Sequence, residues 1–119
     1  MSKIKKTSTN YTNKNTLIEE CAEIYAITLI EGRWTLAICC HLMDGKLRFS
    51  DLKKRIPNIT ERMLTLKLRK MEENRLVKRS VYAEVPLRVE YELTEIGQKL
   101  NIVLNHLENW GEEHKKIME

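Results

Sequence analysis

The chain has 119 residues, enough for one domain, and its 32% charged and 42% hydrophobic residues fit a soluble globular protein. No apolar run approaches the ~20 residues that span a bilayer, and the basic N-terminal segment lacks the apolar stretch of a secretory signal. We therefore expect a cytoplasmic protein with no membrane partner. Residues 1–15 are expected to form a flexible basic tail.

The net charge of +4 is distributed unevenly along the chain. Residues 46–79 contain twelve Lys and Arg against four Asp and Glu, a net charge of +8, whereas residues 80–119 have a net charge of −4. Concentrated positive charge is typical of a nucleic-acid-binding surface. A solvated basic helix face would have the same composition, so charge alone leaves both interpretations open.

The chain has three cysteines, Cys21, Cys39 and Cys40. An odd number this small argues against a disulfide framework. Cys39, Cys40 and His41 are consecutive on a predicted helix, where neighbouring side chains point about 100° apart. Such neighbours do not converge easily on one ion, so we expect buried structural thiols rather than a metal site. No cofactor is expected.

Two helices are predicted in the first half of the chain. The segment from Leu17 to Ile30 has a wide apolar arc, and we expect one part of it, including Leu17 and Tyr25, to face a second subunit. Gly32 ends this helix. The segment from Trp34 to Met43 is almost wholly apolar, which predicts the central buried helix of the domain.

A helix-turn-helix is predicted over about residues 50–73. A short strand at Leu47–Phe49 precedes a helix from Ser50 to Ile56, with Ser50 as its N-cap. Pro57 and Asn58 break the chain, and Thr60 then caps a longer helix that runs to about Glu73. A short helix, a tight turn and a longer helix in this order are the pattern of a DNA-binding motif.

The second helix of this motif separates apolar from basic residues. Met63, Leu64, Leu68 and Met71 are expected to point inward at helical spacing. The exposed residues that would read base edges in a major groove are Arg62, Thr65 and Arg69. Glu61 either accepts a hydrogen bond from cytosine or only favours the helix N-terminus. The lysines expected at DNA phosphates are Lys53, Lys54, Lys67 and Lys70.

A β-hairpin is predicted directly after this helix. Leu76–Tyr82 and Leu87–Leu93 alternate in polarity and are joined by a short link, which predicts a wing over about residues 76–93. Arg88 near its tip either reaches a minor groove or a phosphate, or forms a salt bridge with a neighbouring Glu.

The last predicted helix runs from Thr94 to about Met118. Gly97 near its start indicates close packing. A long apolar stripe follows, and one small wing with three short helices offers little surface to cover it, so we expect a homodimer. The residues expected at this interface are Leu100, Leu104, Leu107 and Trp110.

Four sequence blocks in order resemble the HxlR-type family of winged helix-turn-helix regulators, over about Cys21 to Gly111. The blocks are L-I-E-G-R-W-T-L at 29–36, R-F-S-D-L at 48–52, I-T-E-R-M-L-T-L-K-L-R-K-M-E at 59–72 and Y-A-E-V-P-L-R-V-E-Y-E-L-T-E-I-G at 82–97. The resemblance implies a mostly helical α+β fold over residues 16–119. It also implies a dimeric, DNA-binding repressor or activator whose N- and C-terminal helices build the dimer.

The resemblance also bears on two single positions. Several family members sense oxidising or thiol-reactive compounds through a cysteine thirteen residues before the Trp, which is the position of Cys21 here. The usual C-P-V is C-A-E in this chain, so we expect the helix to start before Cys21 and to bury its thiol, leaving a sensor and a structural role open. Arg75 stands where the family has Gly, and Asn74 is expected to supply the left-handed residue.

We therefore predict a sequence-specific regulator that binds double-stranded DNA as a homodimer, with an oxidant or small molecule as a candidate effector. The alternative is a winged-helix module that binds protein or RNA. An enzyme is not expected, because the scattered His41, His106 and His114 have no evident catalytic or metal partners.

Overall fold

The computed structural model describes residues 21–119. The segment that ends at Gly32 and the segment Arg33–Glu119 form two separate compact units, and each is described by itself. The predicted basic tail over residues 1–15 and the predicted interface residue Leu17 lie outside the described residues.

The first unit contains helix α2, Ala22–Ile30. The backbone of Cys21 is extended, with φ −115° and ψ 108°, and α2 begins only after it. The prediction of one helix that runs through Cys21 is therefore wrong, because helical periodicity in the sequence continues across a residue that takes the N-cap conformation. The chain turns at Gly32, whose φ of 90° is accessible to glycine.

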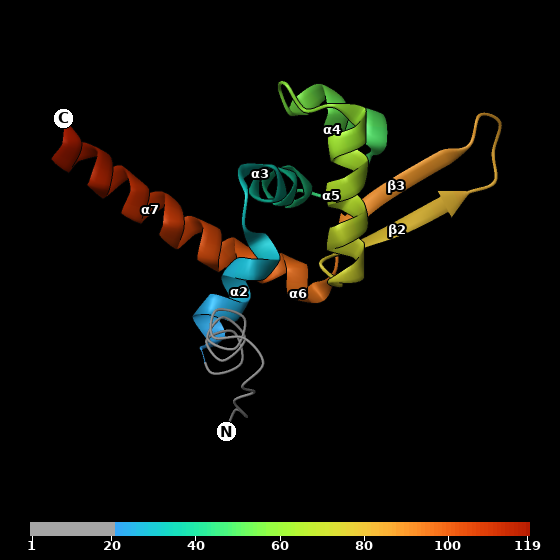
Figure 1. Cartoon of the computed structure of the whole chain (residues 1–119). Coiled ribbons are helices and arrows are strands. Elements are labelled where there is room, and N and C mark those ends of the chain that lie inside the picture. The colour runs from blue at the N-terminus through green and yellow to red at the C-terminus, as the bar shows by residue number, and fades with distance from the viewer. Residues whose placement is uncertain (1–20) are drawn as a thin grey trace, which may run out of the picture. The chain divides into compact units, whose positions relative to one another are not determined.

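The second unit is a winged helix-turn-helix built from helices and a small antiparallel sheet (Figure 1). The sheet has the strand order β1-β3-β2, with β1 at Leu47–Arg48, β2 at Val77–Tyr82 and β3 at Arg88–Leu93. The helices are α3 (Arg33–Leu42), α4 (Phe49–Arg55), α5 (Glu61–Glu73), α6 (Glu95–Gln98) and α7 (Leu100–Met118). The fold class is the one predicted from the sequence, and the elements of this unit follow in the predicted order, except that the last helix is divided into α6 and α7.

The hairpin of β2 and β3 has two different faces. Side chains alternate along a strand, so cross-strand pairs alternate between the faces as well. The pairs Val77–Leu93, Arg79–Tyr91 and Val81–Val89 lie on the inner face, which continues from the core. The pairs Lys78–Glu92, Ser80–Glu90 and Tyr82–Arg88 lie on the outer face.

Helix α3 lies at the centre of the core, as its apolar sequence predicts. Ile38, Cys39 and Leu42 of α3 are fully buried, and α3 packs against α4, α5 and β3. The other fully or nearly fully buried side chains include Leu52, Ile56, Ile59, Leu64, Leu68, Met71 and Val77. Of the four α5 residues predicted to point inward, Met63 alone is only half-buried.

The two helices of the helix-turn-helix begin in different ways. The Thr60 hydroxyl accepts a hydrogen bond from the Met63 N–H at 3.0 Å, which confirms Thr60 as the N-cap of α5. The predicted N-cap at Ser50 is wrong. Helix α4 already includes Phe49, and its N-cap is Arg48, whose N–H donates to Asp51 Oδ2 at 3.1 Å.

The end of α5 and the start of α6 meet at Thr94. The left-handed residue after α5 is Arg75, with φ 61°, and not the predicted Asn74, whose φ is −83°. The Thr94 hydroxyl donates to the Arg75 carbonyl at 2.6 Å and accepts from the Gly97 N–H at 3.2 Å. Gly97 is buried against the Leu76 carbonyl, where a Cβ has no room, so the predicted close packing is confirmed.

The predicted single helix from Thr94 to Met118 is interrupted at Lys99. The Lys99 N–H bonds to the carbonyls of Glu95 and Gly97, a tight turn that separates the four residues of α6 from α7. Helix α7 then continues for 19 residues, none of which is buried. Figure 1 shows α7 running away from α4 and α5.

Candidate nucleic-acid interface

Helix α5 presents a basic surface because its apolar residues are used in the core. With Leu64, Leu68 and Met71 buried, the predicted base-reading residues Glu61, Arg62 and Arg69 are exposed and Thr65 is half-exposed. The charged side chains left on the outside of α5 are four Lys and Arg against three Glu, so this surface has a small net positive charge that suits an anionic partner.

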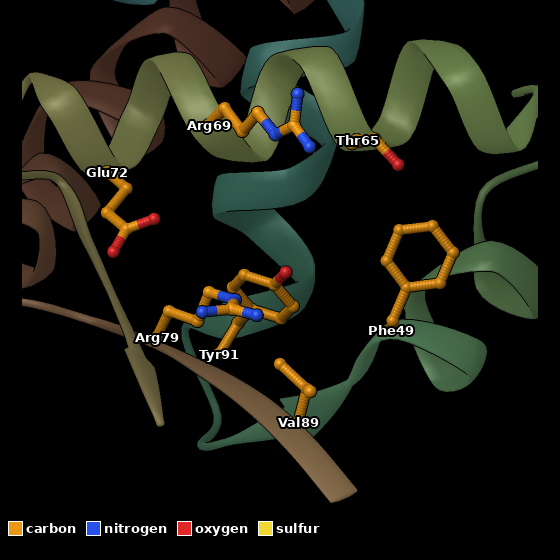
Figure 2. Close-up of a pocket in the computed structure, with 7 residues that line it drawn as sticks. All are labelled: Phe49, Thr65, Arg69, Glu72, Arg79, Val89 and Tyr91. Carbon is orange, nitrogen blue, oxygen red and sulfur yellow. The ribbon is translucent and has the colours of Figure 1, made fainter. Parts of the chain in front are cut away.

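A hollow of about 420 Å³ lies between α5 and the inner face of the hairpin. We call it the α5–wing hollow. One wall is a single stripe of α5, and the other walls come from the start of α4 and from both strands (Figure 2). Its lining residues are Phe49, Thr65, Arg69, Glu72, Arg79, Val89 and Tyr91.

The hollow brings together some of the predicted residues and not others. Thr65 and Arg69 both line it, whereas Arg62 and Glu61 lie outside it toward the N-terminus of α5. Arg79 on β2 also lines it and was missed by sequence reasoning. The available signal was the period of two along β2, which places Arg79 on the face of Val77 and Val81.

Arg88 lies on the outer face of the hairpin and is surrounded by partners. Its guanidinium lies 2.9 Å from a Glu84 carboxylate oxygen and 3.8 Å from one of Glu90, and it stacks over the Tyr82 ring at 4.1 Å. The structure thus contains the salt bridge that was one of the two interpretations of Arg88. Its contact with DNA stays a prediction, and it requires these ion pairs to rearrange.

The four predicted phosphate-binding lysines lie on both helices of the motif. Lys54 and Lys70 are exposed, while Lys53 and Lys67 are half-buried. Lys70 Nζ lies 3.9 Å from Glu73 Oε1, with 70% of each side chain exposed. An ion pair this exposed contributes little free energy, so Lys70 stays available to bind another anion.

The three cysteines lie in different environments. Cys39 is fully buried, and this burial, with a smaller contribution from the neighbouring Cys40, raises the pKa of its thiol to about 11. Cys40 is exposed, so the prediction of a buried thiol is wrong for Cys40, because its side chain points about 100° away from that of Cys39 around α3. Cys21 is half-buried. Over residues 21–119, no three His, Cys, Asp or Glu side chains are grouped so that they could hold a metal ion.

The predicted dimer residues lie largely at the surface. Leu107 is 47% exposed, Trp110 is 66% exposed and stacks on His114 with 5.5 Å between ring centroids, and Leu100 and Leu104 are half-buried. Tyr25 is exposed on α2. Two grooves run along α7, one of about 590 Å³ beside Trp110 and one of about 530 Å³ against α3.

None of the helices within residues 21–119 is both long enough and apolar enough to cross a membrane.

Comparison with known sequences gives a consistent result. The model of the HxlR-like helix-turn-helix family matches residues 29–119. The HTH-type transcriptional regulator YdeP of Bacillus subtilis (strain 168) is 44% identical over 97 residues, which are 82% of this chain and 76% of YdeP. An HTH-type transcriptional regulator of Methanothermobacter thermautotrophicus is 50% identical over 91 residues, 76% of this chain and 70% of that protein.

Comparison with solved structures extends the similarity to the fold. The redox regulator HypR in its reduced form superposes with a TM-score of 0.74 at 40% identity. The superposition covers 80% of this chain and 94% of that chain.

Proposed function

Because this chain belongs to the HxlR-like helix-turn-helix family of transcriptional regulators, we propose that it binds double-stranded DNA sequence-specifically as a homodimer. Helix α5 would enter the major groove and the β2–β3 hairpin would lie at the neighbouring minor groove. The observation that carries the proposal is the basic outer surface of α5, which stands beside a hairpin in the winged-helix arrangement.

We assign the contacts by exposure and chemistry. Arg62 and Arg69 suit guanine, Thr65 suits a thymine methyl or a hydrogen-bond acceptor, and Glu61 suits cytosine. The lysines suit backbone phosphates, which fix position without reading sequence. Arg88 would add a contact only after releasing its glutamates. These roles predict that Arg69→Ala weakens binding to a specific duplex more than binding to an unrelated one.

The dimer follows from α7, which leaves Val103, Leu107 and Trp110 exposed along one side. A contiguous apolar surface of this kind is typical of a subunit interface. A second copy related by a two-fold axis would cover it and place two α5 helices on successive major grooves, about 34 Å apart.

We further propose that Cys21 makes the regulator responsive to oxidants. Its thiol is half-buried and lies at the N-cap of α2, outside the helix that was expected to bury it. The similar protein HypR is a redox regulator, which supports the same role here. A structural thiol remains the competing interpretation.

Selection of duplexes from a random pool tests the DNA-binding proposal. The expected result is an enriched inverted repeat whose half-sites are one helical turn apart, with binding that falls steeply with salt. No enrichment, or tighter binding to single-stranded RNA than to any duplex, would contradict it and favour the RNA-binding alternative.

The thiol proposal is tested on the selected duplex with diamide. We expect diamide to change the affinity of the wild type and of Cys40→Ser, but not that of Cys21→Ser. A response that survives Cys21→Ser would assign Cys21 a structural role.

A further inference from the structure

The inner face of the hairpin contains one charged residue among apolar ones. Arg79 shares this face with five side chains that extend the core toward the wing, namely Val77, Val81, Val89, Tyr91 and Leu93. Arg79 is itself exposed, so its guanidinium is open to solvent at the hollow rather than enclosed by these neighbours. It is therefore accessible to an anion that enters the hollow from outside.

No ion pair joins Arg79 or Arg69 to a carboxylate within residues 21–119. Arg88, three positions along the ladder and on the outer face, is by contrast held by Glu84 and Glu90. The hairpin thus has one arginine whose terminal nitrogens lie near two glutamates and one that lines the α5–wing hollow without an acidic partner among the described residues.

The hollow itself is suited to an anion. Arg69 and Arg79 line it from different elements, α5 and β2 (Figure 2), and with Glu72 the three side chains carry a net charge of +1. Phe49 and Tyr91 form apolar parts of the wall, where a charged contact is less screened than in open water. Its volume of about 420 Å³ exceeds by far the share of one water molecule, about 30 Å³.

The geometry of duplex DNA identifies the anion. Neighbouring major and minor grooves are separated by one sugar–phosphate strand. A protein with α5 in the major groove and its hairpin at the next minor groove must therefore hold that strand between the two elements, at the α5–wing hollow. We propose that Arg79 binds a backbone phosphate of this strand, an assignment that rests on the proposed DNA binding.

This role differs in kind from that of Arg69. A guanidinium binds two phosphate oxygens in parallel, but every nucleotide offers the same oxygens. Arg79 fixes how deeply the wing and α5 are seated, and the side chains of α5 read the bases. Arg79 is thus a positioning residue, whereas Arg69 discriminates between sequences.

The test measures the affinity of Arg79→Ala for the selected duplex and for an unrelated duplex of equal length across a salt series. We expect about a tenfold loss per bound subunit on both duplexes. The slope of log K against log salt should become shallower by about 0.9 per subunit, since one phosphate contact is lost from each. Arg69→Ala should lose affinity mainly on the selected duplex.

Lys78→Ala is the matched control, since it removes one positive charge from the adjacent residue on the outer face of the same strand. We expect less than a twofold change in affinity and an unchanged salt slope. Thermal melts of both variants establish that they fold, and Arg79→Gln serves in place of Arg79→Ala if that variant melts early.

Glu72→Gln distinguishes phosphate binding by Arg79 from a stabilising internal contact between Glu72 and Arg79. If Arg79 binds phosphate, removing the carboxylate lowers repulsion, and affinity rises about threefold on any duplex. A fall in affinity together with a lower melting temperature would show that Glu72 and Arg79 stabilise the fold through their mutual contact, and would overturn the inference.

A neutral methylphosphonate moved along the selected duplex supplies the direct evidence. We expect one linkage per half-site that weakens the wild type but leaves Arg79→Ala unaffected. Unchanged affinity and salt slope for Arg79→Ala would overturn the inference while duplex binding by the wild type keeps the proposed function intact. Absence of duplex binding by the wild type would remove both.

Discussion

Helices α5 and α7 are both amphipathic, and they differ in what covers their apolar sides. Helix α5 buries Leu64, Leu68 and Met71 within its own chain and turns basic residues outward. Helix α7 is longer, has no buried residue and leaves Leu107 and Trp110 in the open. The same kind of sequence pattern thus belongs to a core helix in one case and, in the other, to a helix whose apolar side is exposed within this chain.

The difference shows that helical periodicity in the sequence does not by itself say what covers an apolar stripe. Helix α5 packs on α3 and β2 and is closed by the strands that follow it. Helix α7 follows the core elements in the sequence. Because those elements already pack against one another, they leave little apolar surface for α7 to cover. On the proposed homodimer, the stability of α7 depends on the second subunit, whereas α5 is packed within its own chain.

Leu68→Ala is expected to have the largest effect on stability. Leu68 is 1% exposed, and truncating a buried leucine costs about 3 kcal/mol through lost burial and a cavity. Urea unfolding monitored by circular dichroism measures the loss. Leu66→Ala on the same helix is the control, since Leu66 is 49% exposed and should cost less than about 1 kcal/mol. Equal losses would mean that α5 is not packed as described.

Trp110→Ala should act on assembly. A central aromatic residue of an interface contributes about 2 kcal/mol, and the substitution removes one from each subunit, so the dimer dissociation constant should rise roughly 900-fold. Analytical ultracentrifugation measures it, and Lys116→Ala on the opposite side of α7 should leave it unchanged. If Trp110→Ala dimerises like the wild type, the partner lies on a different face.

Cys39 makes stability depend on pH. The folded chain retains the thiol proton up to about pH 11, whereas an unfolded chain begins to release it near the ordinary pKa of 9.0. The stabilisation is therefore complete below pH 9 and is lost as pH rises toward 11, by about 1.4 kcal/mol between pH 8 and pH 10. The difference in unfolding free energy between the wild type and Cys39→Ala should shrink by that amount. A constant difference would show that the thiol is not desolvated by the core around α3.

Thr60→Ala should have the smallest effect, about 1 kcal/mol, because it removes the side-chain acceptor for the Met63 N–H. Helix α7 supplies the contrast. Its N-cap, Lys99, makes no side-chain capping bond, so Lys99→Ala should change the unfolding free energy by less than about 0.5 kcal/mol. Similar losses for the two variants would remove this distinction between the helices.

Local chemistry made some features predictable from the sequence. Thr60 was identified as a cap because its hydroxyl suits an adjacent N–H, and the buried positions of α5 followed from the helical period. The N-cap at Ser50 was wrong because the carboxylate of Asp51 stabilises an earlier start. Both of these helix starts depend on a hydrogen bond between residues three apart in the sequence. Where several residues could form such a bond, the sequence does not say which one does.

Features that depend on tertiary structure were harder to predict. The importance of Arg79 appears only once the strand register places it opposite Tyr91 and beside α5. The extended conformation of Cys21 interrupts a sequence pattern that reads as one helix. The left-handed Arg75 replaces Asn74 where the chain must turn from α5 into β2, a choice set by the position of the strand rather than by residue preference.

Thr94 has a consequence for the geometry of the assembly. Its hydroxyl bonds the carbonyl of Arg75, at the end of α5, and accepts from Gly97 in α6, which leads into α7. One residue thus joins the helix proposed to touch DNA to the helix proposed to touch the partner. Because α7 is about 28 Å long, a small change of angle at this joint becomes a displacement of several ångströms at its far end. In the proposed dimer, the separation of the two reading helices would therefore depend on the angle between α5 and α7 at Thr94.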